Sequence, residues 1–239
     1  MKENRMRVRD PLGGVPDLTR FFDAYERSFR ELDDYAVHID RLIAGYSRGD
    51  DKGGLTAAYS TVLDKLELNQ RRTQERSGSN ERALEHKGKF SEIFWIGLML
   101  LSFGLCLRVS RSDISRLIAC CERGDRLFEA LVASAAPGLE QKPSAEAFRD
   151  VFGKLYEALS ASPDRRALCV HDYLQAWYVQ TIDGFSFKDV HLEPDPLRYV
   201  GYWCFEAAGL VAALDIDDSA FAGHPHYPRD LVRLYRLPG

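Results

Sequence analysis

"IFWIGLMLLSFGLCL", which runs from Ile93 to Leu107, is the most apolar stretch of the chain and contains 15 residues without a charge. A helix that spans a bilayer needs about 20 predominantly apolar residues, so this stretch is too short to cross a membrane. We expect it to lie within a helix from Glu85 to Val109 that is apolar nearly all round. Such a helix must be covered on every side, and it therefore predicts the centre of a helical bundle.

The sequence before this central helix predicts a helical hairpin. Apolar residues recur at alternating steps of four and three from Leu18 to Tyr46, which places them on one face of a helix that we expect from Asp17 to Gly49. The polar, Gly-rich turn "SRGDDKGG" (47–54) follows, and the same spacing resumes at Leu55. Two long helices joined by a short loop form an antiparallel hairpin.

Helical patterns also follow the central helix. We expect Ser112 to cap one helix, and Ser144 to cap another after the breaker segment "APGLEQKPS" (136–144). A further helix is expected from Asp164 to Ile182, and another, opened by Pro196, from Leu197 to Leu214. The residues expected on or near one face of the first of these two are Leu168, His171, Leu174, Trp177 and Tyr178.

Together these patterns predict an all-α protein. Runs with the period of two that marks half-buried strands are absent from the sequence. We expect a helical bundle with a long antiparallel N-terminal hairpin and a C-terminal helical subdomain. The breaker segment divides the chain into helical domains at 1–136 and 144–239, which we expect to pack together as one globule.

Charge is distributed unevenly along the chain. The formal net charge is -4, yet residues 1–188 carry 28 acids and 28 bases, whereas residues 189–239 carry 8 acids and 4 bases. A local acidic field suits a basic protein partner and repels nucleic acid. We therefore expect a protein partner, with no nucleic acid and no membrane.

Cysteine usage and the N-terminus both predict a cytoplasmic location. Five cysteines lie inside apolar helical patterns, which is typical of buried, reduced thiols in a cytosolic protein. No apolar run follows the basic start "MKENRMRVRD", so no secretory signal is expected. The cysteines are Cys106, Cys120, Cys121, Cys169 and Cys204.

The stretch "GYWCFEAAGLVAALDIDDSAFAGHPHYPRDL" (201–231) concentrates carboxylates and imidazoles. Glu206 lies among aromatic residues, where a buried carboxylate is either a general acid with a raised pKa or a structural anchor. We favour the anchor, because no second carboxylate lies three or four residues further along to complete an acid/base pair.

Two segments of the same stretch resemble metal sites. "DIDDSAF" has aspartates at the first, third and fourth positions of a calcium loop, but Ala220 and His226 occupy the places of its glycine and glutamate. We therefore expect Asp217 or Asp218 to end one helix and cap a short turn. In "GHPHYP", no third ligand at a fixed spacing joins His224 and His226, which we expect in a surface loop, followed by Pro228 at the start of the last helix and Asp230 in its first turn.

The residues quoted above resemble those of a known family, the polymorphic nuclease immunity (PoNi) proteins. The C-terminal domain of that family is similar to this chain at Arg198–Val232, and its N-terminal domain, more weakly, at "LIAGYSRGDD". The matching motif residues that we expect to determine the fold are Tyr46, Ser47, Gly49, Gly201, Tyr202, Trp203, Glu206, Tyr227, Pro228 and Asp230.

The resemblance implies an all-α bacterial immunity protein that is not an enzyme and needs no cofactor. Its partner would be the nuclease domain of a cognate toxin, encoded by an adjacent gene and often delivered by type VI secretion. Within the acidic C-terminal region we expect Asp215, Asp217 and Asp218 to be exposed and to contact this toxin.

Two alternatives remain open at this point. One is a metal-dependent hydrolase that uses Glu206, Asp217, Asp218, His224 and His226, and the other is a helical scaffold for a different protein partner. The sequence does not decide between a monomer and a homodimer.

Overall fold

The computed structural model describes residues 35–77, 90–142, 144–180, 188–189 and 201–238, and these parts of the chain form helices and no strand. The expected all-α class is confirmed. The helices are α2 (Tyr35–Arg48), α3 (Lys52–Ser77), α4 (Phe90–Leu107), α5 (Arg111–Ala119), α6 (Arg126–Ala135), α7 (Arg149–Ser160), α8 (Pro163–Trp177), α9 (Phe205–Leu214) and α10 (Arg229–Arg236).

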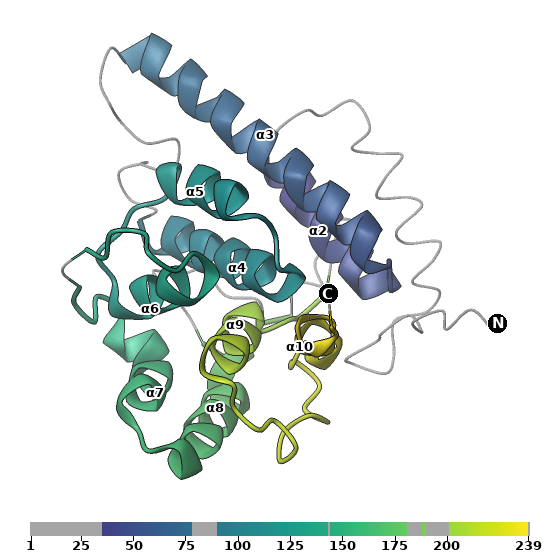
Figure 1. Cartoon of the computed structure of the whole chain (residues 1–239), viewed down its shortest axis with the longest axis vertical. Helices are drawn as coiled ribbons and strands as arrows, with labels where there is room; N and C mark the ends of the chain where they lie inside the picture. The colour runs from purple at the N-terminus through teal and green to yellow at the C-terminus, as the bar shows by residue number, and fades with distance from the viewer. Residues whose placement is uncertain (1–34, 78–89, 143, 181–187, 190–200, 239) are drawn as a thin grey trace.

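Helix α4 lies at the centre of the bundle, as its apolar sequence predicts. It packs against α9, α6, α10, α5 and α3, and Figure 1 shows it between α5 above and α9 below. From Phe94 to Leu107 all its side chains are buried except that of Ile96, which is partly exposed. No helix in the described ranges has the length and hydropathy to cross a membrane.

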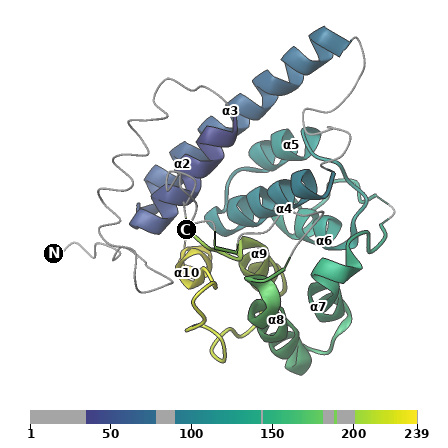
Figure 2. The same cartoon turned by 180° about the vertical axis from the view of Figure 1, so that it is seen from behind.

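Helices α2 and α3 pack against each other and are joined by residues 49–51. Gly49 makes this tight connection, because it follows α2 with a φ of 89°, and its backbone N–H donates to the carbonyls of Gly45 and Tyr46 at 3.1 Å each. The expected first helix began at Asp17, and its part up to residue 34 lies outside the described residues. Seen from behind, α3 extends beyond the other helices at its C-terminal end (Figure 2).

Two of the expected helix caps are wrong. Ser110, not Ser112, caps α5: its backbone is extended and its Oγ accepts the N–H of Asp113 at 3.1 Å. Ser144 does not cap α7, whose N-cap is Phe148. The neighbouring Ala145 is already paired with the start of α6, because its N–H donates to the Gly124 carbonyl at 2.9 Å and its carbonyl accepts from Arg126 at 2.8 Å. This pairing holds the chain extended where we expected the helix to begin.

The expected bounds of α8 and α9 also need correction. Helix α8 ends at Trp177, and its buried side includes Val170, Tyr173 and Leu174, so the placement of Leu168 on that side is wrong. Helix α9 begins at Phe205, whereas we expected Leu197. Residues 201–204 are not helical, since the N–H of Cys204 donates to the carbonyl of His226 at 2.8 Å and ties this segment to the loop before α10.

Candidate functional site

The motif residues of the family resemblance, here called the signature, lie in two parts of the chain that meet in one buried contact. The indole N–H of Trp203 donates to the Oγ of Ser47 at 2.8 Å, although 156 positions separate them. The ring of Tyr46 meets that of Trp203 edge to face, with centroids 5.3 Å apart. The end of α2 is therefore fastened to the segment that leads into α9.

Gly201 gives this contact its room. Its φ of 116° lies in the region that favours glycine, and a Cβ added there would lie 2.5 Å from the Oγ of Ser47 and 2.4 Å from Nε1 of Trp203. A larger residue would therefore collide with both atoms of the hydrogen bond.

Glu206 is the hub of a second buried cluster. Its side chain is 1% exposed, and its Oε1 accepts from the hydroxyl of Tyr173 at 2.8 Å, the indole of Trp177 at 2.7 Å and the indole of Trp95 at 3.2 Å. Burial raises the pKa of Glu206 above its ordinary value, while the donors from Tyr173 and Trp177 act in the opposite direction. The carboxylate joins α4, α8 and α9, which favours the structural anchor over a general acid.

The aspartates after α9 differ in their surroundings. Asp215 is exposed and ends the helix in the left-handed conformation, and Asp217 is exposed and accepts from the backbone N–H and hydroxyl of Ser219 at 3.0 Å each. Asp218 is 7% exposed and accepts from the hydroxyl of Tyr227 at 2.8 Å and from Arg236 at 2.7 Å. The expectation that Asp218 is exposed is therefore wrong, because it turns inward to hold α10.

The start of α10 closely follows the sequence pattern. Pro228, which we expected as the first helical residue, is the N-cap, and the helix begins one position later at Arg229. Asp230 lies in the first turn, as expected, 3.1 Å from Arg233. The acid in the first turn complements the partial positive charge of the helix start. The signature residues of this region therefore have structural partners.

The two histidines of the expected surface loop have different environments. His226 is buried and stacks on Tyr178, with ring centroids 5.0 Å apart and planes within 7°, and its Nδ1 lies 3.2 Å from the carbonyl oxygen of Tyr202. The surface placement of His226 is therefore wrong, since its ring fills a gap beside α8. His224 is partly buried.

In the described parts of the chain, the structure does not arrange the five residues of the hydrolase alternative as a metal site. No group of three or more His, Cys, Asp or Glu side chains in the described ranges is arranged to hold a metal ion. Glu206 is surrounded by Tyr and Trp donors, and Asp218 is engaged by Tyr227 and Arg236. All five cysteines are buried and free, as expected from their apolar surroundings.

We predict that the ring of His224 titrates far below the ordinary range. Burial, with a smaller contribution from His226 and His171, lowers its pKa from 6.5 to about 4. The folded protein should therefore lose stability as the pH falls from about 6.5 through about 4, because the unfolded chain binds the proton first. NMR titration of the ring gives the midpoint, and in His224→Asn the stability loss over this range should be smaller. A midpoint near 6.5 would contradict the prediction.

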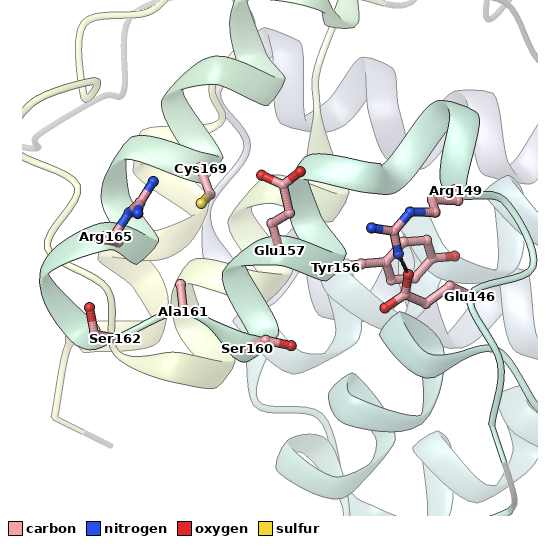
Figure 3. Close-up of a pocket in the computed structure, with 9 residues that line it drawn as sticks. All are labelled: Glu146, Arg149, Tyr156, Glu157, Ser160, Ala161, Ser162, Arg165 and Cys169. Carbon is pink, nitrogen blue, oxygen red and sulfur yellow. Dashed lines mark hydrogen bonds and ion pairs between the residues drawn. The ribbon is translucent and has the colours of Figure 1, made fainter.

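An open hollow of about 570 Å³ lies between α7 and α8 (Figure 3). Arg165 and Cys169 line it from α8, and Glu157 lines it from α7. At its other end Glu146 pairs with Arg149. No local motif marks this hollow, because the packing of two successive helices creates it.

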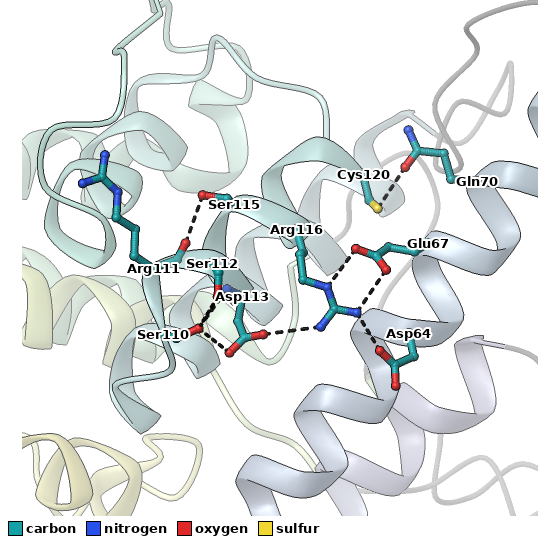
Figure 4. Close-up of polar contacts among 10 residues, drawn as sticks. All are labelled: Asp64, Glu67, Gln70, Ser110, Arg111, Ser112, Asp113, Ser115, Arg116 and Cys120. Carbon is teal, nitrogen blue, oxygen red and sulfur yellow. Dashed lines mark hydrogen bonds and ion pairs between the residues drawn. The ribbon is translucent and has the colours of Figure 1, made fainter.

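A second polar group joins α3 to α5 (Figure 4). Arg116 lies 2.8 Å from Glu67, 2.6 Å from Asp64 and 3.4 Å from Asp113. The hydrogen bond from Arg116 lowers the pKa of Glu67. These acids are thus paired with Arg116 and do not form a free acidic surface.

The comparisons with known proteins support the fold and the C-terminal part of the family resemblance. Residues 123–231 match the family described as the C-terminal domain of PoNe immunity proteins (PoNi). The crystal structure of protein PA2201 from Pseudomonas aeruginosa is similar over 98% of this chain and 92% of its own, with a TM-score of 0.66 and 21% identity, which supports the fold alone. No curated protein matches the sequence.

Proposed function

We propose, because residues 123–231 match the C-terminal domain of PoNe immunity proteins, that this chain is such an immunity protein, which binds a cognate secreted DNase toxin and neutralises it by direct contact. The family points to immunity against a nuclease toxin. The finer proposals are that an adjacent gene encodes the toxin, that type VI secretion delivers it, and that the two proteins meet in the cytoplasm.

The family match is the observation that carries this proposal. It covers α6 to the start of α10, and the signature residues inside it are committed to the fold: Trp203 binds Ser47, Glu206 anchors three helices and Tyr227 holds Asp218. Because these residues stabilise the fold, we expect the function to depend on other residues, at the surface of the protein. We therefore propose that the chain inhibits by binding and is not itself an enzyme.

Charge supports a nuclease as the partner. A nuclease needs a basic surface to hold the phosphates of its substrate, and acidic side chains on an inhibitor accelerate association with such a surface. Asp215 and Asp217 are exposed after α9, and we propose that they contact the toxin. Two further acids of this region are not free for such a contact, since Glu206 is enclosed and Asp218 is bound by Arg236.

Co-expression tests the proposal. The nuclease domain encoded beside this gene should kill a sensitive bacterial host when produced alone, and this protein should restore growth and co-purify with the domain. A nuclease domain from an unrelated toxin is the control for cognate recognition, and a catalytically inactive version shows that killing requires the nuclease activity. Continued killing without co-purification would refute the proposal.

A further inference from the structure

The outward face of α8 exposes apolar surface. Large apolar side chains that are more than half exposed in the described ranges are Leu168 at 52%, Val179 at 60% and Leu237 at 56%. Leu168 lies on α8, and Val179 lies in the turn directly after it, where its N–H donates to the carbonyl of Ala176 at 3.2 Å. Isolated exposed leucines are common, so Leu168 indicates a binding surface only together with the residues around it.

Two carboxylates flank Leu168 on the same face. Asp164, Leu168 and Asp172 follow each other at steps of four, which aligns them along one side of α8, and all three are exposed. Val179 follows in the turn directly after the helix and is also exposed. The Nδ1 of His171 lies 4.0 Å from a carboxylate oxygen of Asp172. The three side chains thus form an outward-facing strip of more than two turns, with the apolar Leu168 between two acids, and Val179 exposes further apolar surface beyond its end.

The hollow between α7 and α8 borders this strip. Cys169, the neighbour of Leu168, lines it together with Arg165, one residue after Asp164 (Figure 3). Opposite them on α7, Glu157 is paired with Lys154 at 2.8 Å. The strip therefore lies beside the hollow, whose lining includes the residues that follow Asp164 and Leu168 in the sequence.

We propose that this outward face of α8, formed by Asp164, Leu168, Asp172 and Val179, docks against the cationic, phosphate-binding surface of the nuclease toxin. The inference rests on the proposed function and adds a contact surface to it. The carboxylates would face basic side chains of the toxin, while Leu168 would bury apolar area between them and Val179 would bury apolar area at one end of the contact.

Charge favours this occupant over the other candidates. A second copy of the chain packed through the same face would bring Asp164 and Asp172 close to like charges, and an anionic lipid surface would repel them as well. The substrate-binding surface of a nuclease has the opposite sign, because it must hold phosphates. The same two acids therefore attract the proposed partner and disfavour the alternatives.

The test compares variants with matched controls in binding to a catalytically inactive form of the nuclease domain encoded beside this gene. Leu168→Arg places a cation in the centre of the face and should weaken binding by about tenfold or more. Leu237→Arg makes the same change at another exposed leucine and should alter the Kd by less than about threefold. Circular dichroism and thermal melting show that both variants remain folded.

A second variant separates charge from packing. Asp172→Lys should slow association by about fivefold or more at low salt, with the difference shrinking as salt is added. Glu140→Lys, an exposed acid in the loop after α6, makes the same change in net charge and should have little effect. If the wild-type protein binds and both α8 variants bind within about threefold of it, the α8 inference is overturned and the proposed function stands. If the wild-type protein does not bind, both fail.

Discussion

Replacement of Trp203 by alanine is expected to lower the free energy of unfolding by about 3–5 kcal/mol, the range for deletion of a buried large aromatic side chain. The indole is 7% exposed, meets Tyr46 edge to face, and donates its N–H to Ser47 at 2.8 Å. The alanine variant loses this packing and the hydrogen bond together, at the point where α2 is fastened to the C-terminal part. Chemical denaturation followed by circular dichroism measures the loss.

Trp203→Phe separates the two contributions. It keeps an aromatic ring against Tyr46 but removes the N–H donor to Ser47, so its loss of stability should be smaller than that of the alanine variant. Leu237→Ala, at an exposed position, should be close to neutral. A Trp203→Ala protein with the melting temperature of the wild type would show that this residue is not part of the core.

The second large effect is expected for Glu206→Leu. The substitution keeps a similar volume but takes the acceptor away from Tyr173, Trp177 and Trp95, and each buried donor that loses its acceptor costs about 1–3 kcal/mol. We therefore expect the free energy of unfolding to fall by about 3 kcal/mol or more, measured by denaturation at neutral pH.

Glu206→Gln is the matched control for this prediction. Its amide oxygen can still accept from the three donors, so it should retain most of the stability that the leucine variant loses. Equal stability of the leucine variant and the wild type would contradict the anchor role. Loss of toxin neutralisation in a glutamine variant that still folds and binds the toxin would instead indicate a chemical role for the carboxylate.

The features that were correctly predicted depend on local composition. The central position of α4 follows from a helix without a polar face, and the burial of Glu206 follows from the aromatic residues beside it. The Ser47–Trp203 contact was not predicted, because the spacing of residues within a segment carries no information on which distant segment it meets. Both residues belong to the motif of the family resemblance, but the motif gives no information on whether they are in contact.

The errors arose where backbone conformation or tertiary contacts decided between residues that are equivalent by local sequence. Ser110 and Ser112 are both good N-cap residues, and the extended backbone of Ser110 selects it. Asp217 and Asp218 are adjacent, yet Arg236 and Tyr227 draw Asp218 inward. His226 is buried because the aromatic residues of α8 offer it a stacking surface.

The division of the chain into domains at 1–136 and 144–239 stays a prediction. The family match begins at Arg123, and so includes α6, which our division assigns to the first domain. The contact of Asp215 and Asp217 with the toxin likewise remains a proposal.

The position of α4 has a consequence for the synthesis of the protein. This helix ends at Leu107, but α9 and α10, which cover much of it, begin only at Phe205 and Arg229. During translation its apolar surface therefore leaves the ribosome long before its cover exists. The cover of α4 is complete only when the last helix has been made, so a nascent or truncated chain would be a target for chaperones and proteases.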